Sequence, residues 1–135
     1  MTDANVETKL NTVEHGELDF QVYFVRERWQ PTVRSIRFDG IEGAAVSIEA
    51  QRALANAEVI VFGPSNPWLS IAPILAVPGM RERLLARAVP RVALSPIVGG
   101  EAIKGPAAKL MAELGYSVTA VAVAEYYGDI INGFV

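Results

Sequence analysis

The amino-acid sequence predicts an α/β protein, a Rossmann-like three-layer fold with a mainly parallel sheet. Short apolar runs end in turn residues and are separated by segments with helical spacing, so that four strands alternate with three helical crossovers. The runs after the first are apolar on both faces, which is typical of strands covered by helices on both sides. The chain has 135 residues, 51% of them hydrophobic, which suffices for one core, so we treat residues 1–135 as a single domain.

The first part of the chain is polar and weakly patterned, and it contains one ambiguous element. Residues 6–10 predict a short strand. In residues 17–29 the apolar side chains alternate as in a strand, but Phe20, Tyr23 and Phe24 would share one face of a helix. Acidic residues begin this segment and basic residues end it, an arrangement that complements the helix dipole. We therefore favour a helix.

The next three elements follow from clearer patterns. Residues 33–38 predict a strand that closes at the turn residues Asp39-Gly40. Residues 47–57 have one apolar face and begin with Ser47, a favourable N-cap, so they predict a helix. Residues 59–62 are an uninterrupted apolar run and predict a buried strand.

Prolines divide the middle of the chain. Pro67 is suited to the first position of a helix, and we expect that helix to be interrupted around Pro73. A second helix is expected over residues 80–87, followed by a strand over residues 91–95.

The last third repeats this alternation. A helix is expected from Pro106 to a terminal glycine, Gly115, because its apolar residues fall three and four positions apart. Residues 118–123 are almost wholly apolar and predict a strand. One or two helical turns are expected over residues 124–130, and residues 133–135 resemble the start of another strand.

Two loops are candidates for ligand binding. In open α/β sheets ligands bind beyond the carboxyl ends of the strands, where residues 63–66 and 95–100 are expected to lie. Small residues and a helix N-terminus at Pro67 favour an anion or a nucleotide there. Asn66 is either a helix N-cap or a ligand contact, and Ser65 either binds an oxygen of a phosphate or fixes the turn.

Two further features of these loops have alternative explanations. The pair Gly99-Gly100 is explained first by a backbone conformation that favours glycine, and second by a close approach of the backbone to a ligand. Lys104 precedes the N-terminus of a helix, where the dipole is unfavourable for a cation. Either a bound anion or full exposure to water would resolve that conflict.

Composition excludes several functions. The formal charge is −3 and the pI about 5.2, so the chain has no electrostatic basis for binding nucleic acid. There is no cysteine, and the single histidine, His15, lies beside a glycine in a predicted turn with no nucleophile motif near it. Neither a P-loop nor a G-x-G-x-x-G follows any strand, and no acidic cluster suggests a metal site.

No membrane segment or signal peptide is expected. Residues 59–80 form a segment without charged side chains that is long enough to cross a bilayer. Four prolines fall within this segment, and a continuous helix does not tolerate them. The N-terminus is polar and lacks the apolar region of a signal peptide. We therefore expect a cytoplasmic protein.

Several motifs together resemble the 2-phospho-L-lactate transferase family, and the likeness extends over nearly all 135 residues. The combination is much more specific than any one motif. The motifs are Met1-Thr2-Asp3, Gly16-Glu17-Leu18-Asp19-Phe20-Gln21, Tyr23-Phe24-Val25-Arg26, Ile36-Arg37-Phe38-Asp39-Gly40, Gly63-Pro64-Ser65-Asn66-Pro67, Ser70-Ile71 with Pro73-Ile74-Leu75-Ala76-Val77-Pro78-Gly79, Ser95-Pro96-Ile97-Val98-Gly99-Gly100 and Lys104-Gly105-Pro106-Ala107.

The resemblance implies a step in the biosynthesis of the deazaflavin coenzyme F(420). Such enzymes transfer a phospholactyl or phosphoenolpyruvyl group from a guanosine diphosphate conjugate to a hydroxyl of the deazaflavin precursor Fo, release GMP, and use Mg²⁺. Ser65 and Asn66 would hold the diphosphate or the accepting hydroxyl, and the other implied binding residues surround them. Those residues are Met1, Thr2, Asp3, Gly63, Pro64, Gly99, Gly100 and Lys104.

The sequence departs from the family in one respect. Family members are longer, begin with a strand and a glycine-rich nucleotide loop, and supply metal-binding aspartates from the part before Met1. We therefore expect a fragment that lacks the N-terminal strand, the metal ligands and the C-terminal elements, and that is able to form a homodimer. The alternatives are a nucleotide-sugar-binding regulatory protein of related fold and a non-catalytic remnant.

Overall fold

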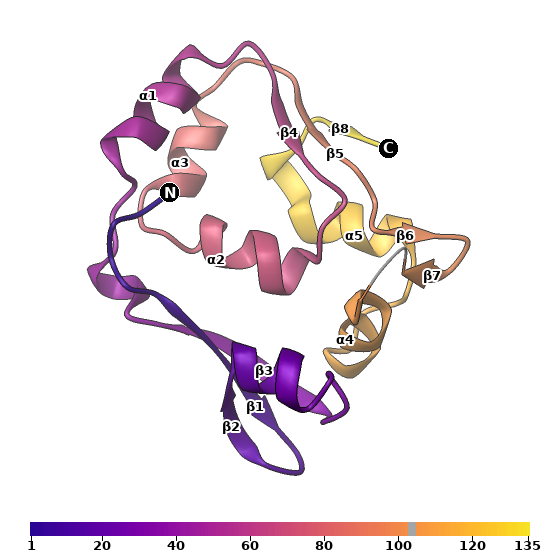
Figure 1. Ribbon diagram of the computed structural model, residues 1–135. Coiled ribbons are helices and arrows are strands. Elements are labelled where there is room, and N and C mark those ends of the chain that lie inside the picture. The colour runs from indigo at the N-terminus through magenta and orange to yellow at the C-terminus, as the bar shows by residue number, and fades with distance from the viewer. Residues whose placement is uncertain (103–104) are drawn as a thin grey trace.

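A computed structural model describes residues 1–102 and 105–135 (Figure 1). Strands β4 (Ile60–Phe62), β5 (Arg91–Ala93) and β8 (Gly133–Phe134) form a parallel sheet in the order β4-β5-β8. Helical segments connect these strands, as parallel pairing requires. The predicted α/β class with a parallel sheet is therefore confirmed.

A second, antiparallel sheet lies apart from the first, at the bottom of Figure 1. It consists of β1 (Glu7–Thr12), β2 (Gly16–Asp19) and β3 (Val33–Asp39) in the order β2-β1-β3. The expected strand over residues 33–38 forms, but it belongs to this sheet and not to the parallel one. The reason is its alternation of exposed and covered residues, which suits a sheet with one face in water.

The segment from residue 17 to 29 combines both interpretations of its sequence. It remains a strand to the end of β2 and then turns into a short helical segment, η1 (Val22–Arg26), in which the hydrogen bonds span five residues. The predicted helix is therefore confirmed only for the second half of the segment. The pairing of Leu18 with Leu10 explains the strand in the first half.

The helices of the middle of the chain form largely where they were predicted. Helix α1 (Ile48–Asn56) is capped by the Ser47 hydroxyl, which accepts a hydrogen bond from the Ala50 N–H at 3.3 Å. The predicted interruption around Pro73 takes the form of a change of helix type, because the π-helical segment η3 (Pro67–Ile71) ends there and α2 (Ala72–Leu75) begins, with no intervening loop. Pro73 lies in the first turn of α2, where a missing N–H costs little. Helix α3 (Met80–Leu85) follows.

The strand predicted over residues 118–123 is wrong. The segment is helical, as part of α5 (Ala120–Tyr127), and the Thr119 hydroxyl caps it by accepting from the Ala122 N–H at 3.1 Å. Alternating alanine and valine gave an apparent strand pattern, although alanine is the best helix former. The buried side chains Ala122, Val123 and Tyr127 follow helical spacing instead.

The remaining elements complete the chain. Helix α4 (Ala107–Glu113) ends as predicted at Gly115, whose φ of 84° is in the left-handed region. Its N–H donates to the Ala112 carbonyl, and the next N–H donates to the Met111 carbonyl, which closes the helix. The short elements are η2 (Ile41–Gly43), β6 (Ile97–Val98), β7 (Glu101–Ala102) and η4 (Gly128–Ile130).

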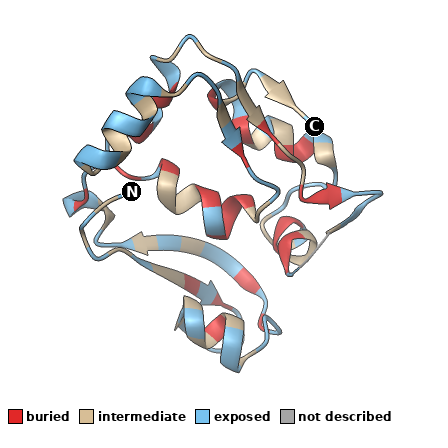
Figure 2. Cartoon of the chain, turned by 45° about the horizontal axis from the view of Figure 1, so that its top comes forward, coloured by how far each residue is buried: buried red, intermediate tan, exposed pale blue. Residues whose placement is uncertain are grey.

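Two apolar clusters hold the fold together (Figure 2). The larger cluster packs the parallel sheet against α2, α3 and α5. The smaller one contains Leu10, Tyr23, Val33, Leu69 and Leu110, and so joins the antiparallel sheet to η3 and α4. This second cluster places η1 opposite the turn at the end of β4. Within the described residues, no helix is both long and apolar enough to cross a bilayer.

Candidate functional site

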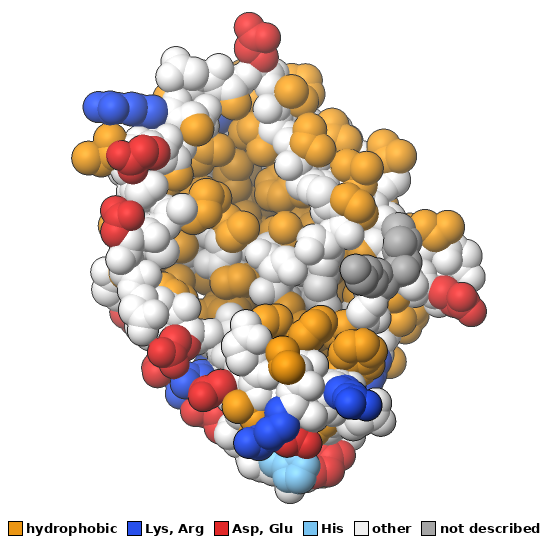
Figure 3. All heavy atoms as spheres, viewed as in Figure 1, with side chains coloured by type: hydrophobic (Ala, Val, Ile, Leu, Met, Phe, Trp, Pro, Cys, Tyr) orange, Lys and Arg blue, Asp and Glu red, His pale blue; other side chains and the backbone are white. Residues whose placement is uncertain are grey.

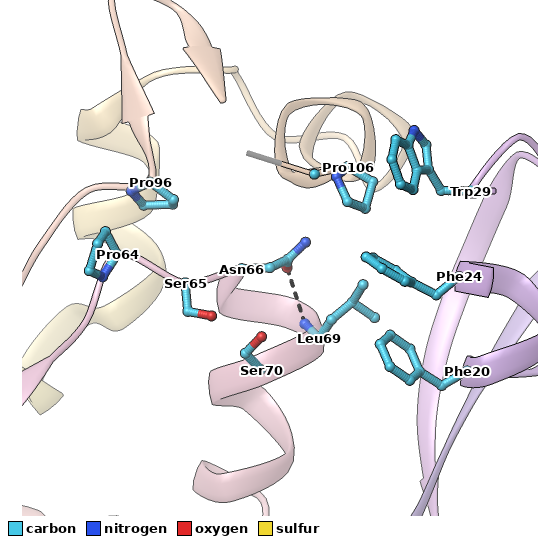
Figure 4. Close-up of a pocket in the computed structure, with 11 residues that line it drawn as sticks. Phe20, Phe24, Trp29, Pro64, Ser65, Asn66, Leu69, Ser70, Pro96 and Pro106 are labelled. Carbon is cyan, nitrogen blue, oxygen red and sulfur yellow. Dashed lines mark hydrogen bonds between the residues drawn. The ribbon is translucent and has the colours of Figure 1, made fainter. Parts of the chain in front are cut away.

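A pocket of about 430 Å³ lies between the turn that follows β4 and the segment η1 (Figure 4). The turn and the first helical residues form one wall, the residues before β6 and α4 form a second, and aromatic residues form the third. The lining residues are Phe20, Phe24, Trp29, Pro64, Ser65, Asn66, Leu69, Ser70, Pro96, Gly105 and Pro106. The carboxyl end of β4 therefore carries a pocket, where the sequence predicted a ligand site.

Asn66 caps the helix that begins at Pro67. Its side-chain oxygen accepts hydrogen bonds from the Trp68 N–H at 3.0 Å and from the Leu69 N–H at 3.1 Å. The Ser70 N–H donates to the Asn66 carbonyl at 2.9 Å, and Pro67 has no N–H. The backbone donors of this helix N-terminus are thus already paired, so any polar contact with a ligand must come from side chains.

The amide nitrogen of Asn66 is the polar group best suited to such a contact. It is buried and has no hydrogen-bond partner among the described residues. Figure 4 shows the amide turned from the helix toward Pro106, across the pocket. An unpaired buried donor costs about 1–3 kcal/mol, and a ligand acceptor would remove that cost.

Three aromatic side chains form the wall opposite the turn. The ring centroids of Phe20 and Phe24 lie 5.4 Å apart, and those of Phe24 and Trp29 lie 5.5 Å apart. Figure 4 shows all three rings facing the pocket. No charged side chain lines the described pocket, so the wall suits a flat, uncharged ring system.

An unusual backbone conformation positions Trp29. Arg28 and Trp29 have φ angles of 49° and 51°, in the left-handed region that costs a non-glycine residue about 1–2 kcal/mol. The Trp29 N–H donates to the Tyr23 carbonyl at 3.0 Å, and the Tyr23 ring is fully buried in the smaller core cluster. Burial raises the pKa of the Tyr23 phenol, which therefore stays neutral. Strain of this kind gathers at functional sites.

Sequence reasoning missed the aromatic wall. The spacing of Phe20 and Phe24, four residues apart on a predicted helix, was the available signal. Nothing in the sequence indicated the left-handed pair that brings Trp29 beside them, because neither Arg28 nor Trp29 favours that conformation.

The structure brings together only some of the predicted binding residues. Pro64, Ser65 and Asn66 line the pocket, and Gly63 lies immediately before them without lining it. Gly99 and Gly100, with φ angles of 61° and 84°, instead form the turn of the β6–β7 hairpin. Their backbone role is thereby explained.

The predicted residues at the N-terminus lie in another place. The Met1 carbonyl accepts a hydrogen bond from the Ser47 N–H at 2.8 Å. Thr2 and Asp3 line a separate shallow groove with residues 43–48, at the start of α1. Lys104, the remaining predicted contact, lies outside the described residues.

The described residues contain no cluster of three metal-ligating side chains. Within residues 1–102 and 105–135, no three histidine, aspartate or glutamate side chains gather as metal ligands would. Among the described residues that line the pocket there is also no carboxylate. The expectation that Mg²⁺ ligands come from outside the 135 residues stays a prediction.

Together these features define an α/β protein with a largely apolar pocket at the carboxyl edge of a parallel sheet. A model of the family 2-phospho-L-lactate transferase CofD matches residues 1–132. The chain therefore belongs to this family, as its motifs predicted.

Curated relatives agree with the family assignment. The chain is 42% identical to the 2-phospho-L-lactate transferase of Methanosarcina mazei over 135 residues, which are 100% of the chain and 44% of that protein. It is 43% identical to the phosphoenolpyruvate transferase of Streptomyces coelicolor over 138 residues, which cover 99% of the chain and 43% of that protein. The chain thus spans less than half the length of these relatives.

Solved structures support the fold. A crystal structure of a Bacillus halodurans protein has a TM-score of 0.61 at 15% identity, covering 98% of the chain and 40% of that protein. A second crystal structure of the same protein, described as a member of the upf0052 family, has a TM-score of 0.54 at 17% identity, covering 69% of the chain and 29% of that protein.

Proposed function

We propose that the chain is part of a transferase that moves a phospholactyl or phosphoenolpyruvyl group from a guanosine diphosphate conjugate to the deazaflavin precursor Fo. Family membership supports the transferase class. The single observation that carries the proposal is the pocket itself. An aromatic wall faces a cluster of neutral polar groups, a combination that suits a flat ring system with a hydroxyl-bearing side chain.

The proposed place for the acceptor follows from the lining. The deazaflavin ring lies against Phe24 and Trp29, where ring stacking contributes about 0.5–1.5 kcal/mol beyond the burial of area. Its hydroxyl-bearing chain extends toward Ser65, Asn66 and Ser70. The unpaired amide nitrogen of Asn66 donates to an oxygen of that chain or of the incoming phosphate.

In the proposed reaction the protein mainly positions the two substrates and forms no covalent bond with them. The Fo hydroxyl oxygen forms a bond to the phosphorus that carries the lactyl or enolpyruvyl group. The diphosphate P–O bond breaks, GMP leaves with the electron pair, and the hydroxyl proton passes to water. Transfers of this type are accelerated mainly by alignment and by neutralisation of charge. When bound, Mg²⁺ would supply that neutralisation from ligands outside the described residues.

The guanosine diphosphate conjugate requires a different surface. None of the described residues that line the pocket is charged, and burial of unpaired charge is costly, so these residues alone do not suit a diphosphate. We assign the conjugate to the part of the pocket beside Ser65 and Pro96. Gly99, Gly100 and Lys104 stay proposed contacts of the conjugate, although the two glycines do not line the pocket and Lys104 lies outside the described residues. Met1, Thr2 and Asp3 are the weakest members of the proposed site, because they contact the start of α1. A cytoplasmic location and a homodimer remain part of the proposal.

The proposal is tested by reconstitution. The 135-residue chain would be co-expressed with the part of the Methanosarcina mazei relative that the match does not cover, and the complex would be supplied with Fo, Mg²⁺ and the guanosine diphosphate conjugate of lactate. Formation of the phospholactyl product of Fo together with GMP is expected. A folded complex that forms neither product would overturn the proposal, and selective binding of a UDP-sugar without affinity for Fo would favour the regulatory alternative.

A further inference from the structure

Helix α4 joins two walls of the candidate pocket. Pro106, immediately before the helix, lines one wall, and Trp29 belongs to the aromatic wall. Further along the helix, Lys109 and Glu113 contact the backbone that follows Trp29 in the sequence. The same short helix therefore begins at the pocket and holds the segment that carries part of its aromatic wall.

Two charged side chains make these contacts. The Lys109 ammonium donates to the Pro31 carbonyl at 2.8 Å, and the Val33 N–H donates to one carboxylate oxygen of Glu113 at 3.1 Å. The other oxygen of Glu113 pairs with the Lys109 ammonium, so both contacts belong to one network. Hydrogen bonds to charged groups are roughly twice as strong as those between neutral groups. The network thus fixes the backbone where it enters β3.

The residue between these two anchors is held from another side. The Thr32 N–H and hydroxyl donate to the Glu14 carboxylate, each at 2.8 Å, and the Val13 N–H donates to the Thr32 carbonyl at 2.9 Å. These hydrogen bonds tie the segment to the antiparallel sheet. The contacts of α4 are the polar contacts that relate Trp29 to Pro106.

The charges of the network are unfavourable for α4 itself. Lys109 lies in the first turn and Glu113 is the last residue, so each charge lies at the end of the helix where the dipole disfavours it. The order of lysine before glutamate, four positions apart, is also the less stabilising one. Local rules therefore do not explain the pair, and such conflicts are expected near functional sites.

The left-handed conformation of Trp29 requires support from both sides. Its N–H donates to the Tyr23 carbonyl at 3.0 Å, and its carbonyl accepts from the Tyr23 hydroxyl at 3.4 Å. Two residues later, Lys109 holds the Pro31 carbonyl, and the same ammonium lies 6.0 Å from the centroid of the Tyr23 ring. A strained pair of this kind persists only where its surroundings determine it strongly.

We propose that Lys109 and Glu113 are positioning residues of the transferase, which hold residues 31–33 so that the Trp29 ring keeps its place in the aromatic wall. This inference rests on the proposed function, because that function gives the wall its role in binding Fo. Neither charged side chain lines the pocket, so both act through Trp29. A wall that is ordered before the ligand arrives binds more tightly, because less order has to be imposed on binding.

Substitutions of lysine by methionine provide the test and its control. Lys109→Met removes the contact with the Pro31 carbonyl and the pairing with Glu113. Figure 3 shows acidic and basic side chains over the antiparallel sheet, and Lys9, whose ion pairs lie within that sheet, gives the matched control Lys9→Met. Lys109→Arg retains a charged donor and should behave like the parent chain. Circular dichroism and urea denaturation would first establish that the variants fold.

The first readout needs no ligand. Nuclear Overhauser effects between the rings of Phe24 and Trp29 should be present in the parent chain, in Lys9→Met and in Lys109→Arg, and lost in Lys109→Met. The Trp68 indole, which packs against Tyr126, is the internal reference and should not shift. Ring contacts that persist in Lys109→Met would overturn the proposal. If that variant does not fold, Glu113→Gln keeps an acceptor for the Val33 N–H without the charge, and the same loss or persistence decides.

The second readout is a double-mutant cycle on affinity for Fo. Lys109→Met should weaken binding about fivefold or more in the parent chain, because the wall is no longer ordered in advance. It should have no further effect in a chain that already carries Trp29→Ala, since it acts through that ring. Equal losses in both backgrounds would show a general structural effect and overturn the proposal. If the parent chain does not bind Fo, the proposed function fails, and the ring contacts alone decide whether Lys109 positions Trp29.

Discussion

The rings of Phe24 and Trp29 lie with their centroids 5.5 Å apart and their planes inclined by 48°, on one wall of the pocket at the end of β4. Phe24 comes from η1 and Trp29 from the left-handed pair that follows it. Strain at this turn is maintained by the buried Tyr23, whose carbonyl accepts from the Trp29 N–H. The pocket is thus assembled from the antiparallel sheet and the parallel one.

Removal of the indole should weaken binding of Fo. Trp29→Ala deletes the ring that stacks beside Phe24, and the loss of stacking and buried area should reduce affinity about tenfold or more. Val25→Ala is the control, because Val25 is 65% exposed on the same segment and does not line the pocket. Titration of each variant against Fo, followed by the fluorescence of Fo, measures the two affinities. Equal affinities for the two variants would contradict the aromatic wall as the binding surface.

Two substitutions of Asn66 should separate its effect on the stability of the protein from its effect on the binding of Fo. In Asn66→Ser the hydroxyl still caps the helix, but the unpaired amide donor is gone. The free energy of unfolding should therefore stay the same or rise by about 1 kcal/mol, while affinity for Fo falls.

Asn66→Ala is the companion variant, because it removes the cap as well and should cost about 1 kcal/mol of stability. Urea denaturation and ligand titration give the two quantities. If Asn66→Ser binds Fo like the parent chain, the amide nitrogen is not a ligand contact.

The helical assignment of residues 120–127 predicts an effect of the preceding residue. Thr119→Ala removes the hydroxyl that accepts from the Ala122 N–H, and should cost about 1 kcal/mol of unfolding free energy. Ser117→Ala, at an exposed position two residues earlier, is the control and should change stability by less than about 0.5 kcal/mol. A strand in this segment would make the two variants alike.

Acid should weaken the antiparallel sheet. The Arg37 guanidinium donates to Glu17 and Asp39 and holds the pKa of each carboxyl below its usual value. The pKa of each carboxyl is lower in the folded state than in the unfolded state, where it is near 4. The ion pairs therefore stabilise the folded state fully above the unfolded pKa values, and this stabilisation is lost as the pH falls through the folded pKa values.

The thermal midpoint should therefore fall between about pH 5 and pH 3, and the fall should be smaller in Arg37→Met than in the parent chain. Arg34→Met, at an exposed position of the same strand, is the control. Because these charges are solvent-exposed, added salt should reduce the difference. An identical fall in both variants would show that Arg37 does not couple to the acid transition.

Local signals predicted much of the fold. Ser47, Pro67 and Gly115 marked helix ends correctly because capping depends on the residue itself and its nearest neighbours. The helix at residues 120–127 was missed because its alternating alanine and valine imitate a strand, and only packing decides between the two. The separate antiparallel sheet was missed because the strand at residues 16–19 begins a segment that we interpreted as a helix, and because the strand at residues 33–39 was assigned to the parallel sheet.

The candidate site was predicted only in part, because local signals indicate the turn after β4 but not the wall that faces it. Ser65 and Asn66 follow a buried strand, so their place at the sheet edge was evident from the sequence. The wall that they face depends on Leu10 and Tyr23 packing against Leu69 and Leu110, contacts between distant segments. Those contacts, and the left-handed pair that turns Trp29 inward, became visible only in three dimensions.

The central claim, that the pocket binds the deazaflavin acceptor, is tested most directly by contacts between Fo and the protein in solution. Nuclear Overhauser effects from the ring protons of Fo to the side chains of Phe24 and Trp29 are predicted, with a shift of the Asn66 amide resonance on saturation. Saturable binding of Fo with all contacts elsewhere, and with the Trp29 and Asn66 resonances unmoved, would contradict the account.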